Sequence, residues 1–244
     1  MALPSIVTPE YRTIIPSTKQ EITYRPFLVK QEKVLLTAQE SDDPKDQILA
    51  VAKVLAECIT TEDIIVGSLT SFDIEYLFLK LRSKSVGESI TVKLGHQNPS
   101  NPSGTLENKC DFLTEVSINI DDIKPPEVTV DKKIQLTDDI GVVLKFPTFH
   151  EMVNTEQEDD ASVAQIFDML TKCVDYVYDK ENVYNEFTED EVKAWIDTLN
   201  QSQFEKISTF FTDMPSLKHE VTWKCGGCGE EDTVEVEGLS NFFT

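Results

Sequence analysis

Cys225 and Cys228 are the residues whose type and spacing point most directly to chemistry. They lie in the stretch HEVTWKCGGCGEEDTVEVE (219–237), between two segments that alternate apolar and polar residues. Two thiolates at this spacing supply half of a tetrahedral zinc site. The two glycines between them let the backbone curl so that both sulfurs approach one ion at about 2.3 Å. The stretch therefore predicts a zinc-binding turn that needs two further ligands.

The segment 89–120 offers the other two ligands. It contains ITVKLGHQ and NKCDFLTEVSINI, two alternating stretches around a long loop rich in Asn, Pro, Ser and Gly, with His96 and Cys110 at the edges of that loop. Two hairpin tips that share one tetrahedral ion form a zinc ribbon. We therefore predict a structural Zn²⁺ site made of Cys225, Cys228, Cys110 and His96. The alternative is a metal-free turn with no cofactor.

The remaining cysteines have a simpler explanation than metal binding. Cys58 and Cys173 fall on apolar stripes of predicted helices, where a free cysteine behaves as a small buried hydrophobic residue. His150 lies at a predicted helix start, and His219 is expected to point along its strand away from the cysteine turn. His150 is therefore expected to be structural, and His219 is not expected to be a zinc ligand.

A reactive dithiol is disfavoured by its surroundings. Redox-active CxxC pairs lie at helix N-termini, where the dipole stabilises the thiolate. Here the pair precedes GEEDTVEVE, which is strand-like and whose carboxylates would raise the pKa of a nearby thiol. The chain also lacks a glycine-rich phosphate loop and a triad pattern around its three histidines. We predict that it is not an enzyme.

Apolar residues recur at helical spacing in some segments and at alternate positions in others. These two patterns predict the helices and strands that position the candidate residues. Helical spacing predicts helices over 29–41, from the cap Asp43 through Ile59, from Thr70 or Ser71 onward, and over 161–179. A capping box at Thr188–Glu191 predicts another helix, and Ser202 is the expected cap of a last one that ends by Pro215. Alternation predicts strands within 19–29, 89–94, 112–120, 128–131, 134–136, 142–146 and 219–237.

The order of these elements predicts an α+β fold. A β-rich body with zinc-ribbon-like paired hairpins would comprise residues 1–148 plus 216–244, with a helical unit, 149–215, inserted into it. At 244 residues the chain can bury one sizeable core or two small ones. Its end, with Leu239, Phe242 and Phe243, is expected to pack on the body or on a partner.

Charge narrows the classes of partner. The chain has 44 acidic and 22 basic residues, a net charge of −22, without a basic patch. Such a chain is repelled by nucleic acids and anionic membranes, and it suits basic protein partners. It has no 18-residue apolar run, and MALPSIVTPEYRT lacks the regions of a signal peptide. We therefore expect that the chain does not associate with membranes and that it is found in a reducing cytosol.

Several blocks, in order, resemble the baseplate proteins of T4-like bacteriophages. They are IPSTKQEITYRPFLVKQEKVLLTAQES (15–41), LTSFDIEYLFLKLRSKSVGE (69–88), IGVVLKFPT (140–148), and the terminal CxxC followed by FF. In that family a closer Cys pair often stands in the first hairpin, where this chain has Gly95-His96 and Cys110.

The resemblance implies a baseplate hub assembly factor or hub subunit, acting through contacts with hub proteins. It also implies that the chain is found in the host cytoplasm during tail assembly or in the virion baseplate. The alternative reading is a zinc-ribbon adaptor in transcription or in another host or viral complex. The net charge of −22 weighs against the nucleic-acid contacts that many such adaptors make.

Overall fold

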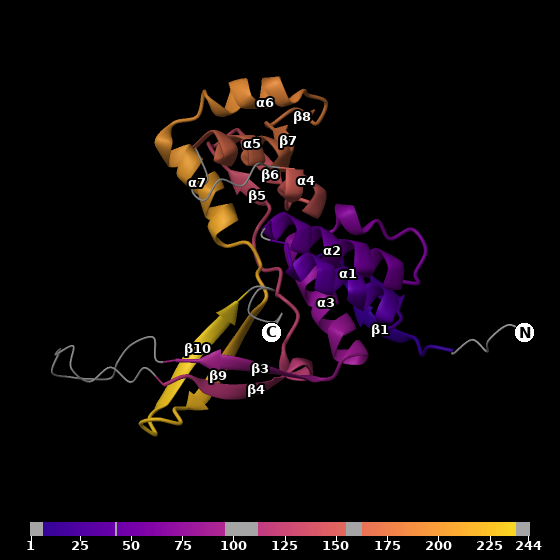
Figure 1. Cartoon of the computed structure of the whole chain (residues 1–244). Coiled ribbons are helices and arrows are strands. Elements are labelled where there is room, and N and C mark those ends of the chain that lie inside the picture. Colours follow the sequence, from indigo (N-terminus) through magenta and orange to yellow (C-terminus); the bar gives the residue numbers. More distant parts are fainter. Residues whose placement is uncertain (1–6, 42, 96–111, 155–162, 238–244) are drawn as a thin grey trace, which may run out of the picture.

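The structure is a computed structural model that describes residues 7–41, 43–95, 112–154 and 163–237. Within these ranges it has seven α-helices and four small antiparallel sheets. This confirms the predicted mixture of helices and strands. The described elements form three groups that follow one another in space: a mixed unit at one end, the N-terminal helical layer in the middle, and a pair of hairpins at the other end (Figure 1).

The N-terminal layer consists of one short hairpin and three helices. These are β1 (Tyr11–Ile14), β2 (Glu21–Tyr24), α1 (Val29–Gln39), α2 (Pro44–Cys58) and α3 (Ser71–Ser85). The predicted caps are confirmed, because Asp43 accepts the N–H of Lys45 at 2.8 Å and Thr70 forms a capping box with Asp73. These local signals set where α2 and α3 begin.

Two antiparallel hairpins hold the segments that carry the predicted zinc ligands. They are β3 (Ser89–Leu94) with β4 (Thr114–Asn119), and β9 (Lys218–Lys224) with β10 (Glu231–Glu237). Their alternation places Ile90, Val92, Ile118, Val221 and Val236 inward, and all five are buried. The two hairpins pack against each other at the end of the molecule remote from α6 (Figure 1).

The mixed unit combines one four-stranded sheet with four helices. The sheet order is β5 (Lys133–Gln135), β6 (Gly141–Leu144), β7 (Val174–Tyr178) and β8 (Val183–Tyr184). The helices are α4 (Phe149–Asn154), α5 (Val163–Cys173), α6 (Glu189–Ile196) and α7 (Gln201–Thr212). The predicted capping box at Thr188 and Glu191 is present.

The structure corrects three details of the predicted elements. The helix expected over 161–179 ends at Cys173, and VDYVY continues as β7, because its β-branched and aromatic residues pair with β6. The strand expected over 128–131 is absent from the described residues. Asn200, not Ser202, caps α7, since its side chain accepts the N–H of Gln203 at 3.0 Å. The segment 149–215 is therefore not wholly helical.

Two clusters of buried side chains form the interior. The first joins the N-terminal layer to both hairpins, and the second fills the mixed unit. Phe72 of α3 belongs to the second cluster and meets Phe146 edge-to-face, with the ring centroids 5.4 Å apart. The division into residues 1–148 plus 216–244 and 149–215 stays a prediction. No helix in the described ranges has both the length and the apolar character that a bilayer span requires.

Candidate metal centre between two hairpins

The cysteine turn connects β9 to β10 and is closed by two backbone hydrogen bonds. The N–H of Cys225 donates to the carbonyl of Glu230 at 2.8 Å, and the N–H of Gly229 donates to the carbonyl of Cys225 at 2.9 Å. Gly229 has φ +77°, a conformation that favours glycine because a side chain there would strain the backbone. The sequence CGGCG thus forms a tight loop that joins the ends of the paired strands β9 and β10.

The turn directs a hydrogen-bond donor at one sulfur. The N–H of Gly227 donates to Sγ of Cys225 at 3.4 Å. Cys225 is buried, whereas Cys228 is exposed. A donor of this kind stabilises a thiolate, which is the form that binds metal. The pair lies in a β-turn, not at a helix N-terminus, which confirms the predicted strand context and leaves no helix dipole to activate a nucleophilic thiol.

The turn contacts the other hairpin directly. The N–H of Gly226 donates to Oγ1 of Thr114, at the start of β4, at 2.9 Å. A Cβ at position 226 would lie 2.8 Å from Cε1 of Phe112, so the ring of Phe112 occupies the space that a larger residue would need. The cysteine turn therefore faces the chain close to the position where Cys110 stands in the sequence.

The structure describes only two of the four predicted zinc ligands. The structure places Cys225 and Cys228 together in the turn, whereas His96 and Cys110 lie outside the described residues. Among the residues that the structure describes, no group of three or more His, Cys, Asp or Glu side chains is arranged to hold a metal. The zinc site and the ribbon built on it stay predictions, supported by the turn and by its contact with β4.

The cysteines and histidine set aside as structural lie outside the turn. Cys58 and Cys173 are buried, as predicted. Burial raises the pKa of the Cys58 thiol to about 11 and that of Cys173 to about 12. His150 lies at the start of α4, as predicted, and is exposed. The helix-stripe interpretation of the two cysteines is therefore confirmed.

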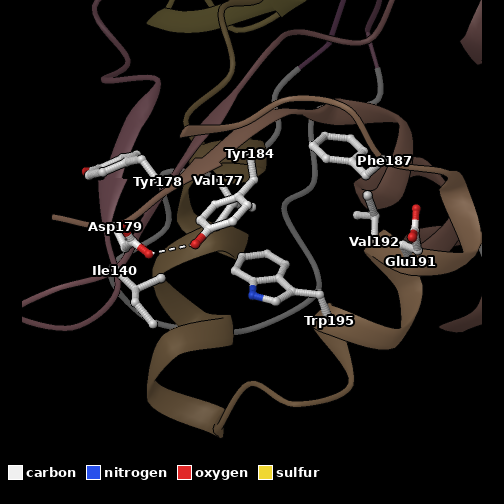
Figure 2. A pocket seen from close by; sticks show the side chains of 9 residues that line it. All are labelled: Ile140, Val177, Tyr178, Asp179, Tyr184, Phe187, Glu191, Val192 and Trp195. Carbon is white, nitrogen blue, oxygen red and sulfur yellow. Dashed lines mark hydrogen bonds between the residues drawn. The ribbon is translucent and has the colours of Figure 1, made fainter. Parts of the chain in front are cut away.

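A second feature, an apolar groove in the mixed unit, was not predicted from the sequence. It has a volume of about 350 Å³ and lies where β7, β8 and α6 meet (Figure 2). We name it the β8–α6 groove, and its lining residues are Ile140, Val177, Tyr178, Asp179, Tyr184, Phe187, Glu191, Val192 and Trp195. These residues come from separate elements, and the pairing of β7 with β6 and β8 brings them together. That pairing was not predicted from the sequence, because the apolar spacing of residues 174–178 indicated a helix.

Comparison with known proteins gives a match along nearly the whole chain. The model of the family described as "T4 bacteriophage base plate protein" matches residues 8–244. Searches of curated proteins and of solved structures found no significant match. The matched range includes the cysteine turn, both hairpins and the β8–α6 groove.

Proposed function

The chain belongs to the T4 bacteriophage base plate protein family, and we propose that it helps to build the central hub of the baseplate through protein–protein contacts, without catalysis. The family match over residues 8–244 is the observation that carries the proposal. The hub role within the baseplate rests on the ordered blocks at 15–41, 69–88 and 140–148. The proposed partners are hub proteins, met in the host cytoplasm during tail assembly or in the virion baseplate.

The proposal includes one structural zinc ion. Cys225, Cys228, Cys110 and His96 would hold it, and the ion would tie the tip of the β9–β10 hairpin to the end of the β3–β4 hairpin. Two observations support this role: the donor N–H at Sγ of Cys225 and the hydrogen bond from Gly226 to Thr114. The ion would supply a cross-link and no reactivity, because protein ligands would take all four positions.

Surface charge supports a protein partner of opposite sign. A net charge of −22 attracts basic proteins over distances of about the Debye length and repels nucleic acid. An acidic factor of this kind can shield a basic or aggregation-prone hub subunit until that subunit is incorporated. The adaptor alternative has no observation in its favour beyond the cysteine turn.

Affinity purification from infected cells tests the function. A tagged chain is recovered at low salt from cells infected by its phage, and co-purifying proteins are quantified by mass spectrometry against a tag-only control. The proposal predicts enrichment of baseplate hub proteins. Recovery without any tail protein contradicts it, and enrichment of transcription proteins instead supports the adaptor alternative.

A further inference from the structure

The β8–α6 groove is an apolar surface that is open to solvent. Tyr184 on β8 and Ile140 beside β6 line it and are 49% and 39% exposed, which is high for large apolar side chains. In the view of Figure 2 the rings of Tyr184 and Trp195 lie next to each other, with Val192 of α6 and Phe187, which precedes α6, farther to the side. Pockets of about 300 Å³ and more that combine aromatic walls with a few polar groups are typical binding sites.

The polar groups of the groove are carboxylates. Of the described residues that line it, Asp179 and Glu191 are charged and none is basic. Asp179 accepts the N–H of Glu181 at 2.8 Å, the N–H of Asn182 at 2.7 Å and the hydroxyl of Tyr184 at 2.8 Å. Glu191 accepts the N–H and the hydroxyl of Thr188 at 2.7 and 2.9 Å. All these donors are neutral, so they do not neutralise the negative charge of either carboxylate.

These hydrogen bonds also keep the two groups ionised. Bonds from the N–H of Glu181, the hydroxyl of Tyr184 and the N–H of Asn182 lower the pKa of Asp179. The backbone and hydroxyl of Thr188 lower the pKa of Glu191. The groove therefore carries two negative charges at neutral pH.

Three lysines close to the groove make contacts other than with Asp179 and Glu191. Lys180 forms an ion pair with Asp139, and Lys193 pairs with Asp168 at 3.0 Å. Lys133 lies over the ring of Tyr178, with Nζ 4.7 Å from the ring centroid. The segment 179–191 has one basic residue and six acidic ones: Asp179, Glu181, Glu186, Glu189, Asp190 and Glu191. The apolar groove thus lies within a strongly acidic surface.

We infer that the β8–α6 groove docks a basic amphipathic segment of a partner protein, with an aromatic or aliphatic side chain between Tyr184 and Trp195 and flanking Lys or Arg residues at Asp179 and Glu191. Apolar contact would supply affinity, and the carboxylates would select the charge of the segment. This inference deepens the proposed function, on which it rests for the identity of the partner as a baseplate protein.

Charge argues against the two other occupants. Residues 238–244, GLSNFFT, supply apolar side chains but no Lys or Arg, and Glu237 before them is negative. A second copy of the chain would bring a net charge of −22 to the same acidic surface. A basic partner segment is the occupant that satisfies both the apolar walls and the acidic rim.

A designed peptide tests the chemistry without any phage protein. The probe is a 12-residue helical peptide with Leu and Phe at positions i, i+3, i+4 and i+7 and Lys elsewhere. One matched probe has Glu in place of Lys, and another has Ala in place of Leu and Phe. Binding to the full chain is followed by the indole N–H signals of its two tryptophans, Trp195 and Trp223, of which Trp223 is buried in β9.

The expected result separates the two tryptophans and the three probes. The Lys probe shifts the Trp195 signal and leaves that of Trp223 in place, and each matched probe binds at least roughly tenfold more weakly. Equal binding of the Glu probe, or a shift confined to Trp223, overturns the inference. A change of the Trp195 signal on deletion of residues 238–244 also overturns it, since the tail would then be the occupant.

Variants of the chain locate the surface. Tyr184→Ala removes an aromatic ring that lines the groove. It is expected to weaken binding of the Lys probe by about tenfold, as loss of an interface anchor does. Val183→Ala, at the neighbouring position on the opposite face of β8 and 61% exposed, is the matched control and leaves binding unchanged. Glu191→Gln keeps the capping box but removes one charge, so binding falls about threefold at low salt and less at high salt. Equal effects of Tyr184→Ala and Val183→Ala contradict the assignment.

Purification of the same variants from infected cells separates the two proposals. If hub proteins co-purify with the unmodified chain and with Tyr184→Ala alike, the groove assignment fails and the proposed function stands. If the Lys probe binds as expected but no tail protein co-purifies, the groove stands and the proposed function fails. Thermal unfolding of each variant shows whether the fold itself is retained.

Discussion

Gly226 in the cysteine turn and Thr114 at the start of β4 are joined by a hydrogen bond of 2.9 Å, although 112 positions separate them in the chain. This bond connects the tips of two hairpins that share one buried cluster of side chains. It places the CGGC turn against the start of β4, in the hairpin whose connecting segment carries Cys110 in the sequence. A zinc ribbon requires two such hairpins to meet at their ends. The contact is the structural basis for the proposed zinc cross-link between the two hairpins, which we call the clamp.

Removal of the Thr114 hydroxyl should loosen this contact. Thr114→Val keeps the β-branched shape but leaves the N–H of Gly226 without that acceptor, which is expected to cost about 0.5–1.5 kcal/mol of the free energy of unfolding in urea. Thr233→Val, at an exposed position of β10, is the matched control. It removes a hydroxyl contact of 3.1 Å with Thr222, whose own hydroxyl stays open to water, so stability should change by less than about 0.5 kcal/mol. Equal effects of the two substitutions would show that the contact contributes nothing specific.

Metal content should depend on the cysteines of the turn. Chain purified without chelator is expected to contain about one zinc per molecule, and Cys228→Ser should lower that content and the melting temperature. The matched control is Cys58→Ala, which removes a buried thiol outside the turn and should keep the zinc. Well under one zinc in the unmodified chain would contradict the clamp while leaving the baseplate role untouched.

Alkaline pH should destabilise the fold through its buried thiols. Burial raises the folded-state pKa of Cys58 to about 11 and of Cys173 to about 12, from an ordinary value of 9.0. Between pH 9 and pH 11–12 these thiols have lost their protons in the unfolded chain but keep them in the folded chain. Stability is therefore complete below pH 9 and falls as pH rises toward 11–12, by at most about 1.4 kcal/mol per pH unit for each thiol.

Unfolding in urea at a series of pH values measures this slope. Cys173→Ala should make it shallower, because one of the two thiols no longer titrates on unfolding. Both thiols should also resist alkylation at pH 8 until the chain is denatured. Rapid native alkylation of Cys173 would contradict its burial.

Gly141 on β6 should not tolerate a side chain. A Cβ there would lie 2.2 Å from the hydroxyl oxygen of Tyr178, its register partner on β7. Gly141→Ala is therefore expected to displace the Tyr178 ring, which lines the β8–α6 groove, and to cost about 1–3 kcal/mol. Gly67→Ala is the matched control, since its Cβ would meet only an ordinary contact at 3.8 Å. Thermal unfolding of the two variants makes the comparison.

Local capping chemistry was readable from the sequence. Asp43, Thr70 and Thr188 each cap the predicted helix, because a short polar side chain accepts a backbone N–H of the first turn. Pro44, after Asp43, has no N–H that needs an acceptor. Strands β3 and β9 were equally readable from their alternation. In these cases the residues of the element itself carry the signal that predicts its conformation.

The groove depended on distant partners and could not be predicted in the same way. VDYVY (174–178) continues the apolar spacing of α5, so the period alone favours a longer helix. Pairing with β6 on one side and β8 on the other decides for a strand. The groove residues Val177, Tyr184 and Trp195 come together only after that pairing.

The proposed role in the baseplate hub is tested most directly by loss of the gene. In cells infected by phage whose copy carries an early stop codon, complete tails are counted by sedimentation and electron microscopy, with and without the intact chain supplied from a plasmid. If the chain helps to build the hub, complete tails are lost without it and the plasmid restores them. A normal yield of complete tails without the chain would contradict it.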